Sequence, residues 1–260
     1  MPSCAKHMPR RLRARGFTQT KNVQLPQKEA PSVEDLLKNN AKWVEERTSS
    51  DPDYFKRMAS THKPEYFFIG CSDARLSVQQ MLGCEAGELF IHRNIANMVV
   101  NTDLNFMSCL TYAVEYLKVK GIILCGHYGC GGVKAAMTNN DHGIIEPWLM
   151  GIRDVARYHR KELATVEDED ERHKRLVELN IQEQALKLYA NPVVQKAQVT
   201  RGGPPIHAFC YDVGEGKVRK LDVDFNAVID KYRNVYSMYD VTEEVKEQPT
   251  FLQSGKLAQD

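Results

Sequence analysis

Three side chains of this chain, Cys71, His127 and Cys130, have the chemical character of zinc ligands. Cys71 and His127 each follow a short apolar run that ends at a glycine. Two thiolates and one imidazole make up the ligand number that a catalytic zinc uses while its fourth position stays open. A structural zinc site would need a fourth Cys or His, usually in a second closely spaced pair, and Cys71 has no such neighbour. The sequence therefore favours a zinc enzyme over a zinc-stabilised binding module.

An acidic and a basic residue, Asp73 and Arg75, follow Cys71 at intervals of two residues. Just beyond a strand, alternate residues can point to the same side, so both can approach a metal held by Cys71. A carboxylate paired with a guanidinium is held in one orientation and remains ionised. It can then accept a hydrogen bond from a zinc-bound hydroxide, since zinc lowers the pKa of bound water towards neutrality. The alternative is a surface Asp–Arg pair in a turn.

The segment from His127 to Cys130 is compact enough for both side chains to reach one ion, and glycines surround it. A rival interpretation is a glycine-rich phosphate loop at a helix N-terminus. The segment lacks the Lys-Ser/Thr ending of a P-loop and the spacing of the dinucleotide-binding fingerprint. A thiol redox site is a third alternative, although Cys125 and Cys130 are not spaced as a Cys-X-X-Cys pair.

The segments that must position these residues alternate between strands and helices. Strands are predicted at 66–70, 89–92 and 122–125, and a terminal hairpin at 206–211 and 217–225. Helices are predicted at 33–46, 54–60 and 104–119, from 131 onward, and in a charged segment at 153–189. This alternation predicts an α/β fold, a single domain with a mostly parallel central β-sheet flanked by helices and an N-terminal helical arm. In such sheets ligands bind beyond the carboxyl ends of the strands, where Cys71 and His127 both stand.

Composition narrows the class of protein further. The formal net charge of +1 over 260 residues gives no reason to expect nucleic acid or an acidic membrane as a partner. No apolar run approaches the roughly 20 residues of a membrane-spanning helix. Seven scattered cysteines lack the spacing of a disulfide framework, so a reducing compartment is the simpler interpretation. The acidic run 168–171 and the histidines at 142, 159 and 173 are expected to face solvent.

The two ends of the chain differ from its centre. Residues 1–28 contain basic but no acidic residues, which is typical of an organellar transit peptide, and Arg15-Gly-Phe17-Thr18 resembles a mitochondrial processing site. The alternative is a disordered basic arm of a cytoplasmic protein. A mitochondrial location is therefore predicted, with the chloroplast or cytoplasm as alternatives. The domain is expected to span 29–240, and 241–260 to form a flexible C-terminal tail.

Three segments resemble the signature motifs of β-class carbonic anhydrases: Cys71-Ser-Asp-Ala-Arg75, the run from Gly87 to Asn97, and Gly126-His-Tyr-Gly-Cys-Gly-Gly132. The resemblance implies one Zn²⁺ per subunit on Cys71, His127 and Cys130, with Asp73 and Arg75 as a catalytic dyad. It implies reversible hydration of CO₂ to bicarbonate by zinc-bound hydroxide, in a homodimer or homotetramer. The apolar CO₂ pocket is expected to be lined by Phe90, Ile95 and Tyr116, partly from the neighbouring subunit. Hydrolysis of carbon disulfide or carbonyl sulfide, and a non-catalytic zinc-binding module, are the alternatives.

Two departures from the family pattern bear on activity and regulation. His62 stands where the family often has a pocket Gln, and its charge would change within the working pH range. The sequence is closer to the bicarbonate-inhibited branch, whose regulatory bicarbonate is bound by an Arg, a Tyr and a Trp. Arg93 and Tyr211 match two of these positions, but the Trp position is Phe68, which lacks the indole donor. In that branch the aspartate can leave its arginine and bind zinc at low pH, and the resemblance leaves open whether Asp73 does so.

Overall fold

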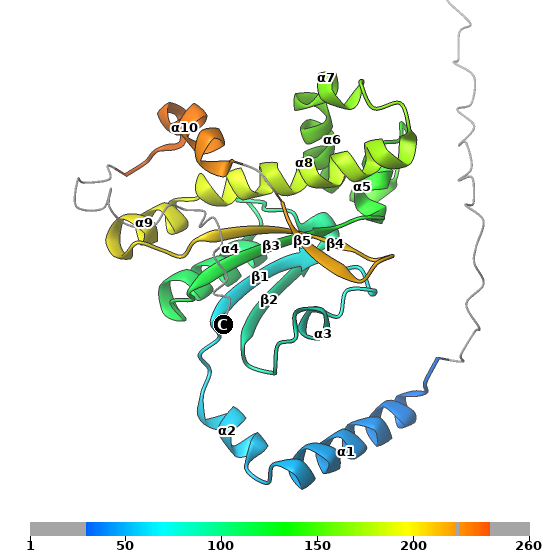
Figure 1. Ribbon diagram of the computed structural model, residues 1–260, viewed down its shortest axis with the longest axis vertical. Coiled ribbons are helices and arrows are strands. Elements are labelled where there is room, and N and C mark those ends of the chain that lie inside the picture. The colour runs from blue at the N-terminus through cyan, green and yellow to red at the C-terminus, as the bar shows by residue number, and fades with distance from the viewer. Residues whose placement is uncertain (1–29, 222–223, 240–260) are drawn as a thin grey trace, which may run out of the picture. The chain divides into compact units, whose positions relative to one another are not determined.

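A five-stranded sheet forms the centre of the protein (Figure 1). The computed structural model describes residues 30–221 and 224–239, so the predicted leader and C-terminal tail lie outside the described residues. The strands are β1 (Tyr66–Cys71), β2 (Leu89–Asn94), β3 (Gly121–His127), β4 (Ile206–Asp212) and β5 (Lys217–Lys220). They lie in the order β2-β1-β3-β4-β5, with β5 antiparallel to β4 and all other pairs parallel. The predicted mostly parallel α/β sheet is confirmed.

Helices cover the sheet unequally on its two faces. The larger core lies beneath α4 (Leu104–Thr111), α6 (Glu146–Tyr158), α8 (Glu169–Tyr189) and α9 (Pro192–Arg201). A smaller cluster of buried residues lies on the other face, against α3 (Val78–Leu82). The remaining short elements of this domain are α5 (Gly131–Ala136), α7 (Arg160–Leu163), η1 (Ile95–Asn97) and η3 (Gly143–Ile145). β1 and β3 are therefore buried on both faces, which explains why their sequences are apolar without alternation.

The helix α8 is the main element packed on the sheet, across β3 and β4 (Figure 1). It begins at the N-cap Asp168, whose side chain accepts a hydrogen bond from the amide of Glu171. Its acidic first turn is exposed, as predicted, whereas the rest of the helix buries one face. A Cβ atom at Gly126 would lie 2.6 Å from Ile181, so only glycine lets β3 and α8 approach this closely.

The N-terminal helix belongs to a separate compact unit of residues up to Phe55, together with 139–141. α1 (Val33–Ser50) begins with the predicted capping box, in which Ser32 and Asp35 each bind the other's backbone amide. Within this unit Trp43 packs edge-on against Phe55, with ring centroids 5.2 Å apart. α2 (Tyr54–Ser60) follows as predicted. No described helix is long and apolar enough to cross a membrane.

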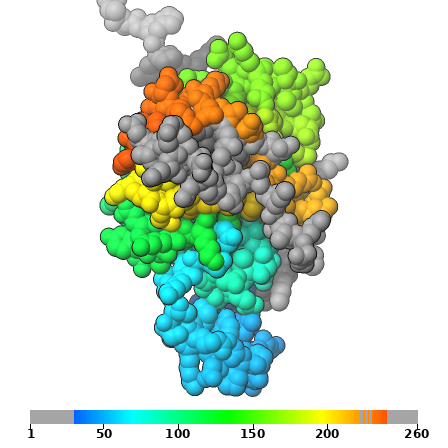
Figure 2. Space-filling model, turned by 60° about the vertical axis from the view of Figure 1, so that its left-hand side comes forward, coloured from blue at the N-terminus to red at the C-terminus, as the bar shows by residue number. Residues whose placement is uncertain are grey.

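Two predicted elements differ from the structure. The helix predicted at 104–119 changes at Tyr112 into a π-helix, η2 (Tyr112–Tyr116), and the Arg201 guanidinium donates to the Val114 carbonyl within it. The final strand ends at Lys220 rather than Phe225. The helix α10 (Phe225–Tyr236) follows it and was missed by sequence reasoning, although the capping Asp224 marks its start. Figure 2 shows α10 in orange beside α9 in yellow, and Gln195 of α9 donates to the Tyr236 carbonyl.

The expectation that His173 faces solvent is wrong. Its side chain is buried on the inner face of α8, and its Nε2 lies 3.2 Å from the carbonyl oxygen of Cys130. The charged sequence around His173 concealed this, because charged neighbours on a helix lie on its opposite face. Burial lowers the pKa of His173 below its ordinary value, against the opposing effect of the Cys130 carbonyl.

This burial predicts a pH dependence of stability. As the pH falls below about 6.5, the unfolded chain gains a proton on this imidazole that the folded chain does not bind. The stabilisation is thus complete above that pH and decreases below it, by at most about 1.4 kcal/mol per pH unit. We expect His173→Asn to reduce the loss of unfolding free energy between about pH 7 and pH 5, as measured by urea denaturation. An unchanged pH dependence in the variant would contradict the buried, neutral His173.

Candidate metal centre

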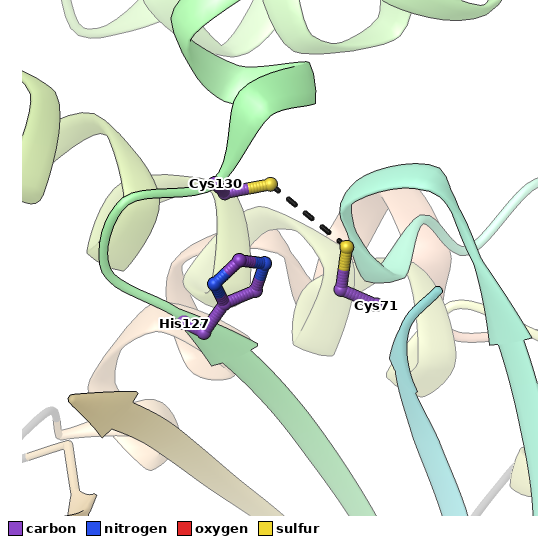
Figure 3. A group of neighbouring side chains, drawn as sticks. All are labelled: Cys71, His127 and Cys130. Atoms are coloured by element: carbon purple, nitrogen blue, oxygen red, sulfur yellow. Dashed lines mark hydrogen bonds between the residues drawn. The ribbon is translucent and has the colours of Figure 1, made fainter. Parts of the chain in front are cut away.

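The three candidate zinc ligands meet at the carboxyl edge of the sheet (Figure 3). Cys71 ends β1, His127 ends the neighbouring strand β3, and Cys130 is the N-cap of α5. Their ligand atoms all lie within 4.8 Å of one another, and all three residues are buried. The two sulfur atoms are 4.0 Å apart, compared with about 3.8 Å expected for two thiolates on one tetrahedral zinc. The donor set and its spacing therefore fit zinc.

The His127 ring is oriented as a metal ligand would be. Its Nδ1 lies 3.0 Å from the carbonyl oxygen of Tyr128, and the Nδ1–H tautomer donates to that oxygen. The other ring nitrogen, Nε2, is buried and has no hydrogen-bond partner among the described residues. A buried polar atom without a partner is costly, and a metal ion on Nε2 would satisfy it.

The two sulfur atoms interact strongly. The contact with Cys130 is the main reason why the pKa of Cys71 is lowered, in opposition to burial. The pKa of Cys130 is raised in turn, by Cys71 and by burial. The backbone amide of Ala96 also points at the Cys71 sulfur. The buried pair of thiols thus readily loses one proton. A cation between the two sulfur atoms would favour loss of the second proton.

Asp73 and Arg75 form the predicted pair beside this cluster. Arg75 Nε lies 2.9 Å from Asp73 Oδ1, and Arg75 Nη2 lies 2.6 Å from Oδ2, a bidentate contact. These hydrogen bonds hold the pKa of Asp73 well below its usual range, so the carboxylate is ionised. Asp73 Oδ2 is also 3.8 Å from His127 Nε2, so the pair lies next to the candidate metal position.

Arg93 binds the backbone of the same loop. Its Nε donates to the Cys71 carbonyl at 2.8 Å and its Nη2 to the Asp73 carbonyl at 2.6 Å. Phe68 is fully buried in the smaller cluster, and Tyr211 packs against that cluster. The three residues predicted for a regulatory bicarbonate site come from β1, β2 and β4, and two donors of Arg93 are already used by the loop.

The predicted CO₂ pocket residues separate into two groups. Ile95 lies beside the loop that carries Cys130, since its side chain would be 2.7 Å from a Cβ at Gly132. His62 and Phe90 belong instead to an aromatic row, completed by Tyr112 and Tyr116. Consecutive ring centroids in this row are 6.2, 5.7 and 5.6 Å apart.

The aromatic row is remote from the metal cluster of the same chain. Phe90 pairs with Phe67, four residues before Cys71, and four residues of strand span roughly 13 Å. Tyr116 is 71% exposed and Tyr112 is 42% exposed. Sequence reasoning missed Tyr112, although its four-residue spacing from Tyr116 could have indicated the pair.

Sequence reasoning also missed the residues that support the ligands from α8 and α6. Tyr128 donates its phenol hydrogen to Glu178 at 2.6 Å. Asn180 donates to the Ala96 carbonyl and Trp148 to the Ile95 carbonyl. No pattern in the sequence marks them, because each contact joins segments 50 or more residues apart.

Fold and site together define an α/β protein with a three-ligand candidate metal centre, and comparisons with known proteins give its family. Residues 66–218 match the family model described as carbonic anhydrase. A carbonic anhydrase of Emericella nidulans is 43% identical over 203 residues, covering 78% of this chain and 89% of that protein. A β-carbonic anhydrase 6, mitochondrial, of Arabidopsis thaliana is 31% identical over 175 residues, covering 64% of this chain and 59% of that protein.

The solved structures agree. A tetrameric β-carbonic anhydrase of Sordaria macrospora matches with a TM-score of 0.70 at 36% identity, covering 72% of this chain and 95% of that chain. The chain belongs to the β-carbonic anhydrase family of enzymes.

The geometry of the cluster predicts how zinc content responds to mutation. We expect Cys71→Ala to reduce bound zinc from one ion per chain to roughly a tenth or less, because two remaining ligands hold the ion far more weakly than three. Elemental analysis after gel filtration measures this. Cys109→Ala removes a half-buried thiol elsewhere and is the matched control. Full zinc content in Cys71→Ala would contradict the assignment.

Proposed function

We propose that this protein is a zinc enzyme that hydrates CO₂ reversibly to bicarbonate and a proton. The observation that carries this proposal is the buried, unpartnered Nε2 of His127, which faces two cysteine sulfurs with the Asp73–Arg75 pair beside it. Cys71, His127 and Cys130 would hold the metal. Zinc, when bound, supplies Lewis acidity that makes water nucleophilic at neutral pH.

Asp73 would orient the attacking water. Its low pKa keeps it an acceptor only, and the bidentate contact with Arg75 restricts its carboxylate to one plane. Arg75 is itself restrained by a hydrogen bond from Nη2 to the Gly129 carbonyl, 3.1 Å long. Arg93 holds the backbone carbonyls of Cys71 and Asp73 by two hydrogen bonds. Binding of Asp73 to the metal at low pH would require its carboxylate to leave both side-chain hydrogen bonds from Arg75.

Removing the charge of Asp73 tests this role. We expect Asp73→Asn to keep its zinc, because Asp73 is not one of the ligands, and to lose most CO₂ hydration, roughly 10²-fold or more. Stopped-flow hydration at about pH 6.5 to 9, with zinc content measured on the same samples, separates the two effects. Near-native turnover in Asp73→Asn would contradict the role of the dyad. An inactive but zinc-loaded wild-type protein would favour carbon disulfide, carbonyl sulfide or a non-catalytic role.

A second subunit would complete the CO₂ pocket. Phe90 and Tyr116 lie too far from the metal cluster of their own chain, yet the half-buried Phe90 and the exposed Tyr116 belong, with His62, to an aromatic row that reaches the surface. An uncharged substrate such as CO₂ suits an apolar wall with few donors. We therefore place this row over the metal site of a neighbouring chain in a homodimer, or in a homotetramer such as that of the Sordaria relative.

Mixed oligomers test which chain supplies the wall. Co-expressed, differently tagged Asp73→Asn and Phe90→Ala/Tyr116→Ala chains would each be impaired as homo-oligomers. In the mixed oligomer, the chain with intact Asp73 faces an intact wall from its neighbour, so we expect one working site per pair and about half of the wild-type turnover per zinc pair. Activity no greater than that of the separate variants would show that the wall acts within its own chain.

A mitochondrial location is proposed on two grounds. The acid-free basic leader of residues 1–28 resembles a transit peptide, and one relative is named as mitochondrial. Import of a fluorescent protein fused behind residues 1–28 into isolated mitochondria tests the proposal, and a fusion that stays outside contradicts it.

A further inference from the structure

Helix α8 contacts the segments that carry His127 and Cys130, and it also contacts Ala96, which lies beside Cys71. His173 lies against the Cys130 carbonyl, and Asn180 donates to the carbonyl of Ala96, whose amide points at Cys71. Glu178, five residues beyond His173, accepts the hydrogen bond of Tyr128 next to His127. The last contact differs from the others because it reaches the peptide that orients the imidazole ligand.

Tyr128 and Gly129 form a two-residue turn whose carbonyl oxygens are hydrogen-bonded to His127 and to Arg75. The Tyr128 carbonyl lies 3.0 Å from His127 Nδ1, and the Gly129 carbonyl accepts from Arg75 Nη2 at 3.1 Å. Gly129 has a φ of +71°, a left-handed conformation that most residues avoid. A glycine places little restraint on the peptide before it, so the orientation of the Tyr128 carbonyl depends on how Tyr128 itself is held.

Tyr128 is held at two points. Its amide donates to the Tyr211 carbonyl on β4 at 2.9 Å, and its phenol donates to Glu178 Oε1 at 2.6 Å. The second carboxylate oxygen of Glu178 accepts from Arg175 Nη1 at 2.7 Å, so the carboxylate is itself fixed in orientation. Arg175 in turn binds Glu162. The turn is thereby tied to a network of charged groups on α7 and α8.

We propose that Tyr128 and Glu178 are a positioning pair, which sets the ring orientation and the tautomer of His127 and thereby the affinity of the site for zinc. The inference rests on the proposed function in taking zinc as the ligand. Bonds from outer groups to ligating histidines fix the tautomer and raise the basicity of the ligand, and their loss typically costs 10- to 100-fold in metal affinity. Here the bond partner is the backbone carbonyl, and the pair acts by holding that carbonyl in place.

The test measures zinc affinity rather than turnover. Zinc dissociation constants are determined by competition with a chromophoric chelator for the wild-type full chain, Tyr128→Phe, Glu178→Leu and the double variant. We expect each single variant to bind zinc about 10-fold more weakly or worse, and the double variant to be no weaker than the worse single one, because both substitutions break the same link. Glu178→Gln keeps an acceptor for the phenol and should restore most of the affinity.

Two control variants remove comparable groups that take no part in the Tyr128–Glu178 hydrogen bond. Tyr158→Phe deletes a phenol hydroxyl from an exposed tyrosine on α6, and Glu171→Gln removes an exposed carboxylate on α8 that pairs with Lys174 instead of Arg175. Both should bind zinc with wild-type affinity. The absorption spectrum of the Co²⁺-substituted protein gives a second readout, since a rotated imidazole changes the ligand field while a general loss of stability does not.

The outcomes separate this inference from the proposed function. Wild-type zinc affinity and an unchanged Co²⁺ spectrum in both Tyr128→Phe and Glu178→Leu, even with lowered thermal stability, would overturn the positioning role alone. A wild-type protein that binds no zinc would overturn the proposed function and this inference together. Equal losses in Glu178→Leu and Glu178→Gln would also overturn the role, because the phenol contact would then not be the cause.

Discussion

The parallel register of β1 against β3 is the constraint on which the rest of the structure depends. Gly70 pairs with Cys125, so the ends of both strands, with Cys71 and His127, arrive at the same edge of the sheet. The backbone turns within three residues after His127, and Cys130 caps α5. Candidate ligands that are distant in sequence thus become neighbours in the folded chain. The conformational entropy cost of aligning them is part of the cost of folding.

The close approach of α8 to β3 makes that edge rigid. Gly126 leaves room for Ile181, and the same helix then reaches the turns on either side of the ligands. One of these turns holds Ala96 at a φ of +61°, a conformation that non-glycine residues seldom adopt and that its surroundings must stabilise. Bonds from Asn180 and Trp148 to neighbouring carbonyls provide this support, and the Ala96 amide is thereby directed at Cys71.

Under the proposed function, the aromatic row and the metal cluster are two parts of one site that a single chain keeps apart. Both are held in place by the sheet, which keeps Phe90 and Cys71 about four residues apart along its strands. The π-helix at Tyr112–Tyr116 stacks its two tyrosines, which extends the row to the surface. A rigid sheet that fixes this separation makes association between chains the natural way to bring an apolar wall over the metal cluster.

The sequence by itself determined the three candidate ligands, the Asp73–Arg75 pair and the parallel α/β sheet, because each depends on residue types at short spacing or on local hydrophobic pattern. It could not determine which groups support the ligands. His173 looked solvent-facing amid charged neighbours, and nothing near Tyr128 in the sequence points to Glu178. The separation of Phe90 from Ile95 was equally hidden. These relations depend on strand register and helix packing between distant segments, and only the tertiary structure decided them.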